Sequence, residues 1–153
     1  MNLGARLMSN TIVILDANFF LIPAQFHIDI YAELERQMPG PFEVVLPDIA
    51  EGELEAKMKR HAEDHRGSRG TLGRQLILAR QIAKKHNVRP VHVERVEGQS
   101  IDNLLLCLAA DLKGSGSLVV IATNDAILRQ KAREKGYATA WLRAKKVIEV
   151  SIR

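Results

Sequence analysis

The stretch TIVILDANFF, residues 11–20, decides the fold of this chain. Residues 11–15 form a short, mostly β-branched apolar run, which predicts a buried strand, and Asp16 follows it directly. A second stretch, SLVVIATNDAIL (117–128), repeats the arrangement, because its apolar run is followed by Thr123, Asn124 and Asp125. A carboxylate at the end of a buried strand is unfavourable unless something stabilises it. Asp16 and Asp125 are therefore the first candidate functional residues.

Apolar runs and helix-like segments alternate along the rest of the chain. The expected strands are 11–15, 42–46, 90–93, 117–123 and 137–142, with 146–150 as an edge strand or a tail. The expected helices fall between them, one after Pro23 and others beginning near Asp48, Thr71, Ser100 and Asn124. The polar stretch HAEDHRGSRGT (61–71) is expected to be a mobile loop. Alternation with short joints predicts an α/β fold, in which helices cover both faces of a doubly wound parallel sheet of about five strands.

The bulk properties fit one cytoplasmic domain. The 153 residues suffice for a single core, so we expect a flexible leader at 1–10 and one domain over 11–153. The single cysteine, Cys107, has no disulfide partner, which fits a reducing compartment. No apolar stretch approaches the roughly 20 residues that a membrane span needs.

The charge distribution favours a polyanionic partner. The formal net charge is +4, and basic residues gather in two runs, 57–74 and 129–146. Solvated helix faces are the alternative explanation for either run alone. Beside a carboxylate cluster, however, two such runs favour a substrate that carries phosphate.

Two further acids can join Asp16 and Asp125. Glu53 and Asp102 are expected in early turns of helices that follow strands. In parallel sheets, ligands bind beyond the carboxyl ends of the strands, so all four acids could face one crevice. Helix capping is the alternative role for Asp16. For Glu53 the alternative is an ion pair with Lys57, and for Asp102 it is interaction with the helix dipole. Spacing alone does not separate Glu53 from Glu51 and Glu55.

Electrostatics links such a cluster to a metal ion. Two carboxylates ~5 Å apart repel by about 3 kcal/mol at an effective dielectric constant of ~20, so several such pairs need a cation or protons. Oxygen ligands suit Mg²⁺ or Mn²⁺. His61 and His65 have helical spacing but no third ligand, so zinc is not expected.

These motifs resemble the PIN domain of metal-dependent ribonucleases. The resemblance rests on VILDAN, on P-x(5)-EL from Pro47 to Leu54, on D-x-x-L-L from Asp102 to Leu106, and on VIATND. It spans about residues 11–150 and implies a strand order of 3-2-1-4-5. It also implies that Asp16, Glu53, Asp102 and Asp125 are the catalytic and metal-binding acids, supported by Asn18, Thr123 and Asn124.

The resemblance implies hydrolysis of RNA. One or two Mg²⁺ or Mn²⁺ ions would bind the scissile phosphate and activate water for in-line attack. Because only 5% of residues are aromatic, we expect recognition of the backbone rather than base stacking. The candidates for contacting the RNA backbone are Lys57, Arg60, Arg66 and Arg69.

Several biological roles remain alternatives. The late stretch GYATAWLR resembles archaeal relatives of ribosomal-RNA-processing PIN nucleases, which would give a ribosome-assembly partner. The family's VapC-type toxins would give an antitoxin partner. A non-catalytic RNA-binding assembly module is the third reading, and family members often form homodimers.

Overall fold

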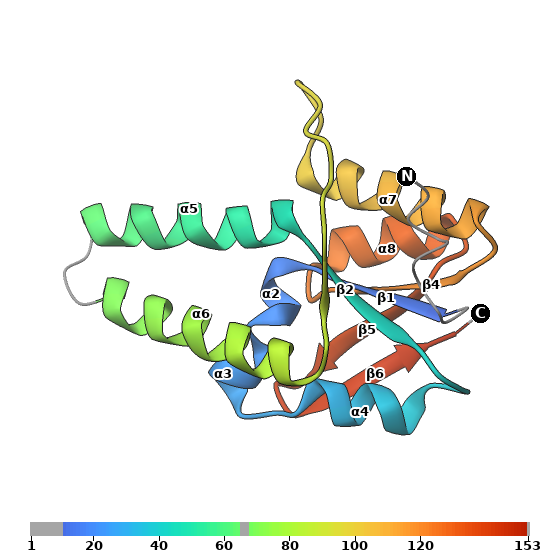
Figure 1. Ribbon diagram of the computed structural model, residues 1–153, viewed down its shortest axis with the longest axis horizontal. Helices are drawn as coiled ribbons and strands as arrows, with labels where there is room; N and C mark the ends of the chain where they lie inside the picture. Colours follow the sequence, from blue (N-terminus) through green and yellow to red (C-terminus); the bar gives the residue numbers. More distant parts are fainter. Residues whose placement is uncertain (1–10, 65–67, 153) are drawn as a thin grey trace.

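The computed structural model describes residues 11–64 and 68–152, with only the backbone described for 61–64 and 68–69 (Figure 1). One six-stranded sheet forms the centre of the structure, in the order β3-β2-β1-β4-β5-β6. The strands are β1 (Thr11–Leu15), β2 (Glu43–Pro47), β3 (Arg89–Val91), β4 (Leu118–Ala122), β5 (Ala138–Arg143) and β6 (Val147–Ser151). The first five are parallel and β6 is antiparallel to β5. The predicted fold class and the order 3-2-1-4-5 are confirmed, and residues 146–150 contribute the edge strand rather than a tail.

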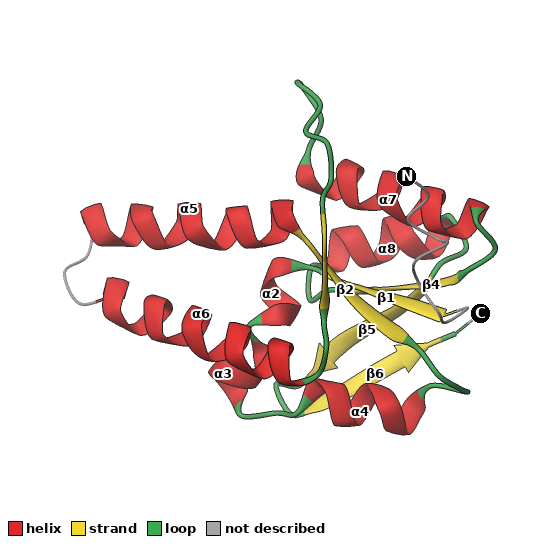
Figure 2. Cartoon of the chain, in the orientation of Figure 1, coloured by secondary structure: helices red, strands yellow, loops and turns green. Residues whose placement is uncertain are grey.

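Helices cover both faces of this sheet (Figure 2). They are α2 (Ala17–Phe20), α3 (Ile22–Phe26), α4 (Ile30–Gln37), α5 (Asp48–Asp64), α6 (Ser68–Lys85), α7 (Ile101–Gly114) and α8 (Ala126–Glu134). Among the described helices, none combines the length and the apolar character needed to cross a bilayer.

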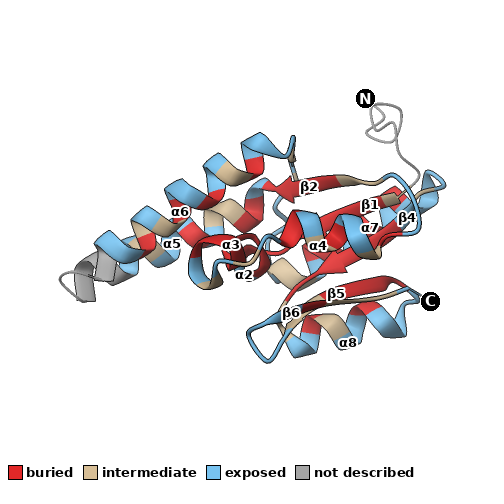
Figure 3. Cartoon of the chain, turned by 90° about the horizontal axis from the view of Figure 1, so that it is seen from below, coloured by how far each residue is buried: buried red, intermediate tan, exposed pale blue. Residues whose placement is uncertain are grey.

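β1 is apolar at successive positions because it serves two cores. Val13 and Leu15 pack in the core with α2, α3, α4 and α6, whereas Ile12 and Ile14 pack in the core with α7 and α8. All four side chains are fully buried. Neighbouring side chains of a strand point to opposite faces, so a central strand covered on both faces needs apolar residues throughout. Figure 3 shows the buried strands enclosed by helices whose outer faces are exposed.

The structure confirms one expectation about helices and corrects another. The helix expected after Pro23 is α4, and Pro23 itself lies in the first turn of the short α3, where a missing N–H costs nothing. The predicted loop at 61–71 is wrong at most of its positions. α5 continues to Asp64 and α6 begins at Ser68, so Thr71 lies inside a helix and does not cap one.

The polar segment becomes helical because two helices support each other there. α5 and α6 lie side by side and extend beyond the sheet as a helical hairpin (Figures 1 and 3). A Cβ on Gly73 would lie 3.5 Å from the sulfur of Met58, so the Met58 side chain of α5 packs against α6 at this glycine. Local composition cannot register this contact, which supplies the stability that an isolated polar helix lacks.

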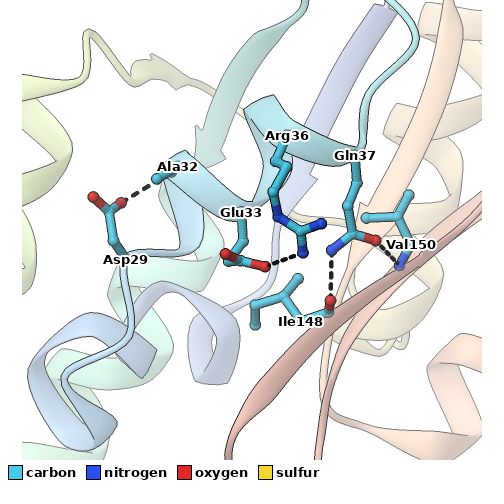
Figure 4. A network of polar contacts seen from close by, with 7 residues as sticks. All are labelled: Asp29, Ala32, Glu33, Arg36, Gln37, Ile148 and Val150. Carbon is cyan, nitrogen blue, oxygen red and sulfur yellow. Dashed lines mark hydrogen bonds and ion pairs between the residues drawn. The ribbon is translucent and has the colours of Figure 1, made fainter.

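A glutamine side chain protects the outer edge of the sheet (Figure 4). At the end of α4, Gln37 Nε2 donates to the carbonyl of Ile148 at 2.6 Å, and Gln37 Oε1 accepts from the N–H of Val150 at 3.2 Å. The amide therefore pairs with the free edge of β6 as a neighbouring strand would. Covered edges do not template pairing with another chain.

Replacing Gln37 by Ala should lower the free energy of unfolding by about 1–3 kcal/mol, because two part-buried backbone groups lose their partners. Urea denaturation of the variant and the wild type measures this difference. Gln25→Ala is the control, since that exposed amide makes only one long contact, 3.4 Å to Gln75. Equal effects of the two substitutions would show that the β6 contact adds no stability.

Candidate acidic site at the carboxyl edge of the sheet

The four predicted acids lie where the strands end and several helices begin. Asp16 is the N-cap of α2 and Asp125 is the N-cap of α8. Asp102 is in the first turn of α7, and Glu53 is near the start of α5. The first residues of α5, α7 and α8 converge beyond the carboxyl ends of β1 and β4 (Figure 1). Helix N-termini carry partial positive charge, which favours carboxylates there.

Asp16 is the most constrained of these acids. Only 6% of the residue is exposed. Its Oδ1 accepts from the N–H of Ala17 at 2.8 Å, and its Oδ2 accepts from Thr123 Oγ1 at 2.6 Å. Burial raises the pKa of Asp16 above 3.8; the two hydrogen bonds oppose this, and the charges of Asp102 and Asp125 add to it. Capping, the alternative role for this residue, is thus present, but it coexists with a buried and electrostatically disfavoured charge.

Thr123 connects two of the acids through one hydroxyl group. It is completely buried, donates to Asp16, and accepts from the N–H of Asp125 at 3.0 Å. Asp125 in turn uses Oδ1 to accept from Ile127 N at 2.8 Å and Leu128 N at 3.3 Å. The hydroxyl therefore sets the relative positions of the carboxylates that follow β1 and β4.

Two asparagines join the ends of three strands beside this hydroxyl. Asn18 Oδ1 accepts from the N–H of Asn124 at 3.0 Å. Asn124 Oδ1 accepts from the N–H of Leu142 at 2.9 Å. The turn that carries Thr123 and Asp125 is consequently held from the β1 side and from the β5 side.

The structure distinguishes Glu53 from its two neighbouring glutamates. Burial raises the pKa of Glu53, the charges of Asp16 and Asp102 raise it further, and Lys57 and Arg60 oppose them. Glu51 and Glu55 lie on the other face of α5, where both contact Arg80, at 2.8 and 3.7 Å. Residues four apart share a helix face and the residue between them does not. Glu53 is thus the glutamate whose pKa the charges of the other acids raise.

Asp102 is coupled to the same group. Burial raises its pKa, the charge of Asp125 raises it further, and Lys131 opposes both effects. The helix that carries it is fixed by Ser100, whose Oγ accepts from the N–H of Asn103 at 3.1 Å. Asp16, Asp102 and Asp125 each therefore raise the pKa of at least one other acid of the group, and the pKa of Glu53 is raised by two of them.

The carboxylate oxygens of these four acids suit a hard cation, although their side chains do not enclose a metal site. Within the described part of the chain, no three His, Cys, Asp or Glu side chains are close enough to hold a metal ion as they stand. The donors are carboxylate oxygens, which suit Mg²⁺ or Mn²⁺. A cation among them would also offset the repulsion that adds to the effect of burial in raising the pKa values of Asp16, Glu53 and Asp102. The chemistry of these residues fits such an ion.

Basic residues surround the acids, and two of them were not predicted. Lys57 and Arg60 are exposed on α5 and act on Glu53; Arg66 and the side chain of Arg69 lie outside the described residues. The unpredicted residues are Lys131, which acts on Asp102, and Arg95. The Nη2 of Arg95 lies 3.2 Å from where a Cβ on Gly52 would be, one residue before Glu53. A glycine in the interior of a helix was the sequence signal for this close approach.

The sheet order and the acids at its carboxyl edge define a PIN-like fold. The sequence matches the PIN-like domain family over residues 13–145, and the chain belongs to that family.

Solved structures show the same fold. The structure of the PIN domain endonuclease Utp24 has a TM-score of 0.65 and 23% identity, covering 91% of this chain and 90% of that one. A domain of a functionally unknown protein from Methanocaldococcus jannaschii DSM 2661 has a TM-score of 0.54 and 19% identity, covering 88% and 92%. Comparison with curated proteins finds no match.

The raised pKa of Asp16 predicts how stability depends on pH. Folding favours the protonated form of Asp16. The stability contributed by this preference is complete below pH 3.8, the ordinary pKa, and is lost as pH rises through the raised value. Asp16→Asn removes the charge and should raise Tm at pH 7, without divalent cations, by about 2–4 °C for each kcal/mol gained. Thermal melts should show this gain shrinking towards pH 4.

Asp48→Asn is a control with the opposite sign. Burial alone would raise the pKa of Asp48, but hydrogen bonds from the N–H of Val93 and from His92 hold it below its usual range. Its ionised form therefore stabilises the fold at pH 7, so the variant should melt earlier there. A lower Tm for both variants at pH 7 would contradict the proposed cost of burying Asp16.

Proposed function

We propose that this protein is a metal-dependent endoribonuclease, with Asp16, Glu53, Asp102 and Asp125 as catalytic acids that bind Mg²⁺ or Mn²⁺. The observation that carries the proposal is the electrostatic coupling of these four carboxylates at the carboxyl edge of a PIN-like sheet. Membership of the PIN-like domain family supports it. The fold shared with a PIN domain endonuclease is consistent with it.

The residues of the chain would divide the work as follows. A bound Mg²⁺ or Mn²⁺ would polarise the scissile phosphate and make water more acidic. Asp16 provides a carboxylate whose position is set by Thr123 and Ala17, so little ordering is needed on binding. Thr123, Asn18 and Asn124 keep the turn before Asp125 in place. Glu53, the exposed member with a raised pKa, can accept a proton from the attacking water.

The basic residues near the acids would hold the RNA backbone. Lys57 and Arg60 lie on α5, which leads outward from the acids along the helical hairpin (Figure 1). Arg69, in the first turn of α6, and Arg66, which precedes that helix in the sequence, are proposed to extend the contact. Binding through phosphates should weaken as salt rises.

For the biological role we propose ribosomal RNA processing in the cytoplasm, with a ribosome-assembly partner. The support is the resemblance of GYATAWLR (136–143) to archaeal relatives of processing nucleases. Growth after expression separates this role from that of a toxin. Unchanged growth with active enzyme supports processing, whereas growth arrest that requires Asp16 favours a toxin paired with an antitoxin.

Cleavage assays on variants of the acids test the proposed chemistry. Asp16→Asn should reduce Mn²⁺-dependent cleavage of single-stranded RNA by more than about 100-fold, since losing only the hydrogen-bond partner of a metal ligand typically costs about 10–100-fold. Thr123→Val should fall in that smaller range. Full activity of Asp16→Asn would refute the metal site. A wild-type protein that folds but does not cleave RNA would favour the non-catalytic RNA-binding assembly module instead.

The neighbouring glutamates supply a matched control for the same assay. Glu53→Gln should reduce cleavage strongly, whereas Glu51→Gln and Glu55→Gln should retain it, because those two contact Arg80 instead of the acids. The three changes are chemically identical and lie within two turns of α5. Equal cleavage rates in all three variants would show that the side of α5 on which Glu53 lies has no role in cleavage.

Metal binding should be visible without turnover. Millimolar Mg²⁺ or Mn²⁺ should raise the Tm of the wild type at pH 7, because a cation that binds only the folded state stabilises it. The rise should be smaller in Asp16→Asn and at pH 4, where carboxylates are protonated. Equal shifts in wild type and variant would place the cation elsewhere.

A further inference from the structure

Two arginines of α8 lie over the only tryptophan of the chain. The guanidinium carbon of Arg129 is 4.9 Å from the centre of the Trp141 ring, and that of Arg133 is 5.7 Å from it. The arginines are four residues apart and therefore share one helix face. Both distances are within the range of cation–π attraction, about 6 Å. The ring thus holds two positive charges side by side.

These two charges are available for an anion. Arg143 forms an ion pair with Glu149, the residue opposite Trp141 in β6. Within residues 11–60 and 70–152, whose side chains the structure describes, neither Arg129 nor Arg133 is paired with a carboxylate. Trp141 is only partly buried. Two adjacent guanidinium groups without a carboxylate suit phosphate oxygens, which they can contact bidentately.

The arginine pair lies next to the acidic site. Asn124 Oδ1 accepts from the N–H of Leu142, so Trp141 adjoins the turn that carries Asp125. The N–H of Arg129 donates to the carbonyl of Asp125 at 2.9 Å. Along α8, Arg129 and Arg133 are about 6 and 12 Å beyond that acid. In Figure 1, α5 and α8 leave the acidic edge in opposite directions.

We propose that Arg129 and Arg133, preorganised by Trp141, clamp phosphates of an RNA strand on the side of the acids away from Lys57 and Arg60. This inference rests on the proposed function, because it places a second segment of the same RNA. The aromatic ring reduces the freedom that the two long side chains lose when they bind. The strand then crosses the four acids between the basic face of α5 and this pair on α8.

RNA binding in the Asp16→Asn background tests the clamp, because that variant does not consume the oligonucleotide. A labelled single-stranded RNA is titrated at several salt concentrations, and affinity is read from anisotropy. Arg129→Ala and Arg133→Ala should each weaken binding and reduce the slope of log K against log salt by about 0.7, the contribution of one phosphate contact to a single strand. Arg→Lys at either position should restore the slope but only part of the affinity.

Lys113→Ala is the matched control. Lys113 Nζ lies 5.3 Å from the centre of the Tyr137 ring. This is a contact of the same kind, but it lies at the amino end of β5, away from the acids. Its removal should leave affinity and slope unchanged. Arginine variants that behave like Lys113→Ala, while the parent still binds RNA, overturn the clamp and leave the proposed function standing.

The single tryptophan gives a second measurement. RNA should change the fluorescence emission of Trp141. Inorganic polyphosphate should change it too, because the two arginines bind phosphate groups rather than bases. Trp141→Phe, which keeps an aromatic ring, should bind more tightly than Trp141→Leu, with circular dichroism confirming that both are folded. Unchanged emission at saturating RNA overturns the clamp, and a parent that binds no RNA overturns the proposed substrate as well.

Discussion

The burial of the Asp16 carboxylate is the constraint on which the functional edge of this protein depends. The residue follows a strand that is enclosed on both faces, so its charge cannot be hydrated as an exposed aspartate is. Two hydrogen bonds compensate in part, and one of them requires Thr123 at the end of the neighbouring strand. The parallel register of β1 with β4, which aligns Leu15 with Ala122, makes that contact possible. The pairing of β1 with β4 therefore also helps to fix the position of the Asp16 carboxylate.

The other acids follow from the same architecture. In a doubly wound sheet every helix that follows a strand begins at the carboxyl edge, so N-caps and first turns gather there. Asp125 and Asp102 occupy such positions. Positive helix termini favour each of these carboxylates separately, while burial and, after it, the charges of the neighbouring acids raise the pKa values of Asp16, Glu53 and Asp102. The edge is thus favourable for individual acids and unfavourable for the group, a balance that a divalent cation would change.

The basic residues are arranged by different physics from the acids. The α5–α6 hairpin extends past the sheet because each helix packs on the other, which carries Lys57 and Arg60 away from the core (Figure 3). On α8, Arg129 and Arg133 are ordered by an aromatic ring rather than by carboxylates. Low aromatic content argues against base stacking as the main means of binding. It did not indicate that the one tryptophan would organise cations, because that contact depends on how α8 packs against β5.

The resemblance of the motifs to PIN domains implied the strand order, and periodicity and apolar runs in the sequence determined the fold class, because central parallel strands must be apolar throughout. They also located Asp16 and Asp125, whose positions after strands are local features. Only the tertiary structure decided that Glu53 faces the acids while Glu51 and Glu55 face Arg80, since the choice depends on where α6 packs against α5. It likewise decided that much of 61–71 is helical and that Arg95 and Lys131 lie beside the acids. Those outcomes depend on contacts between segments far apart in the chain, which local spacing does not record.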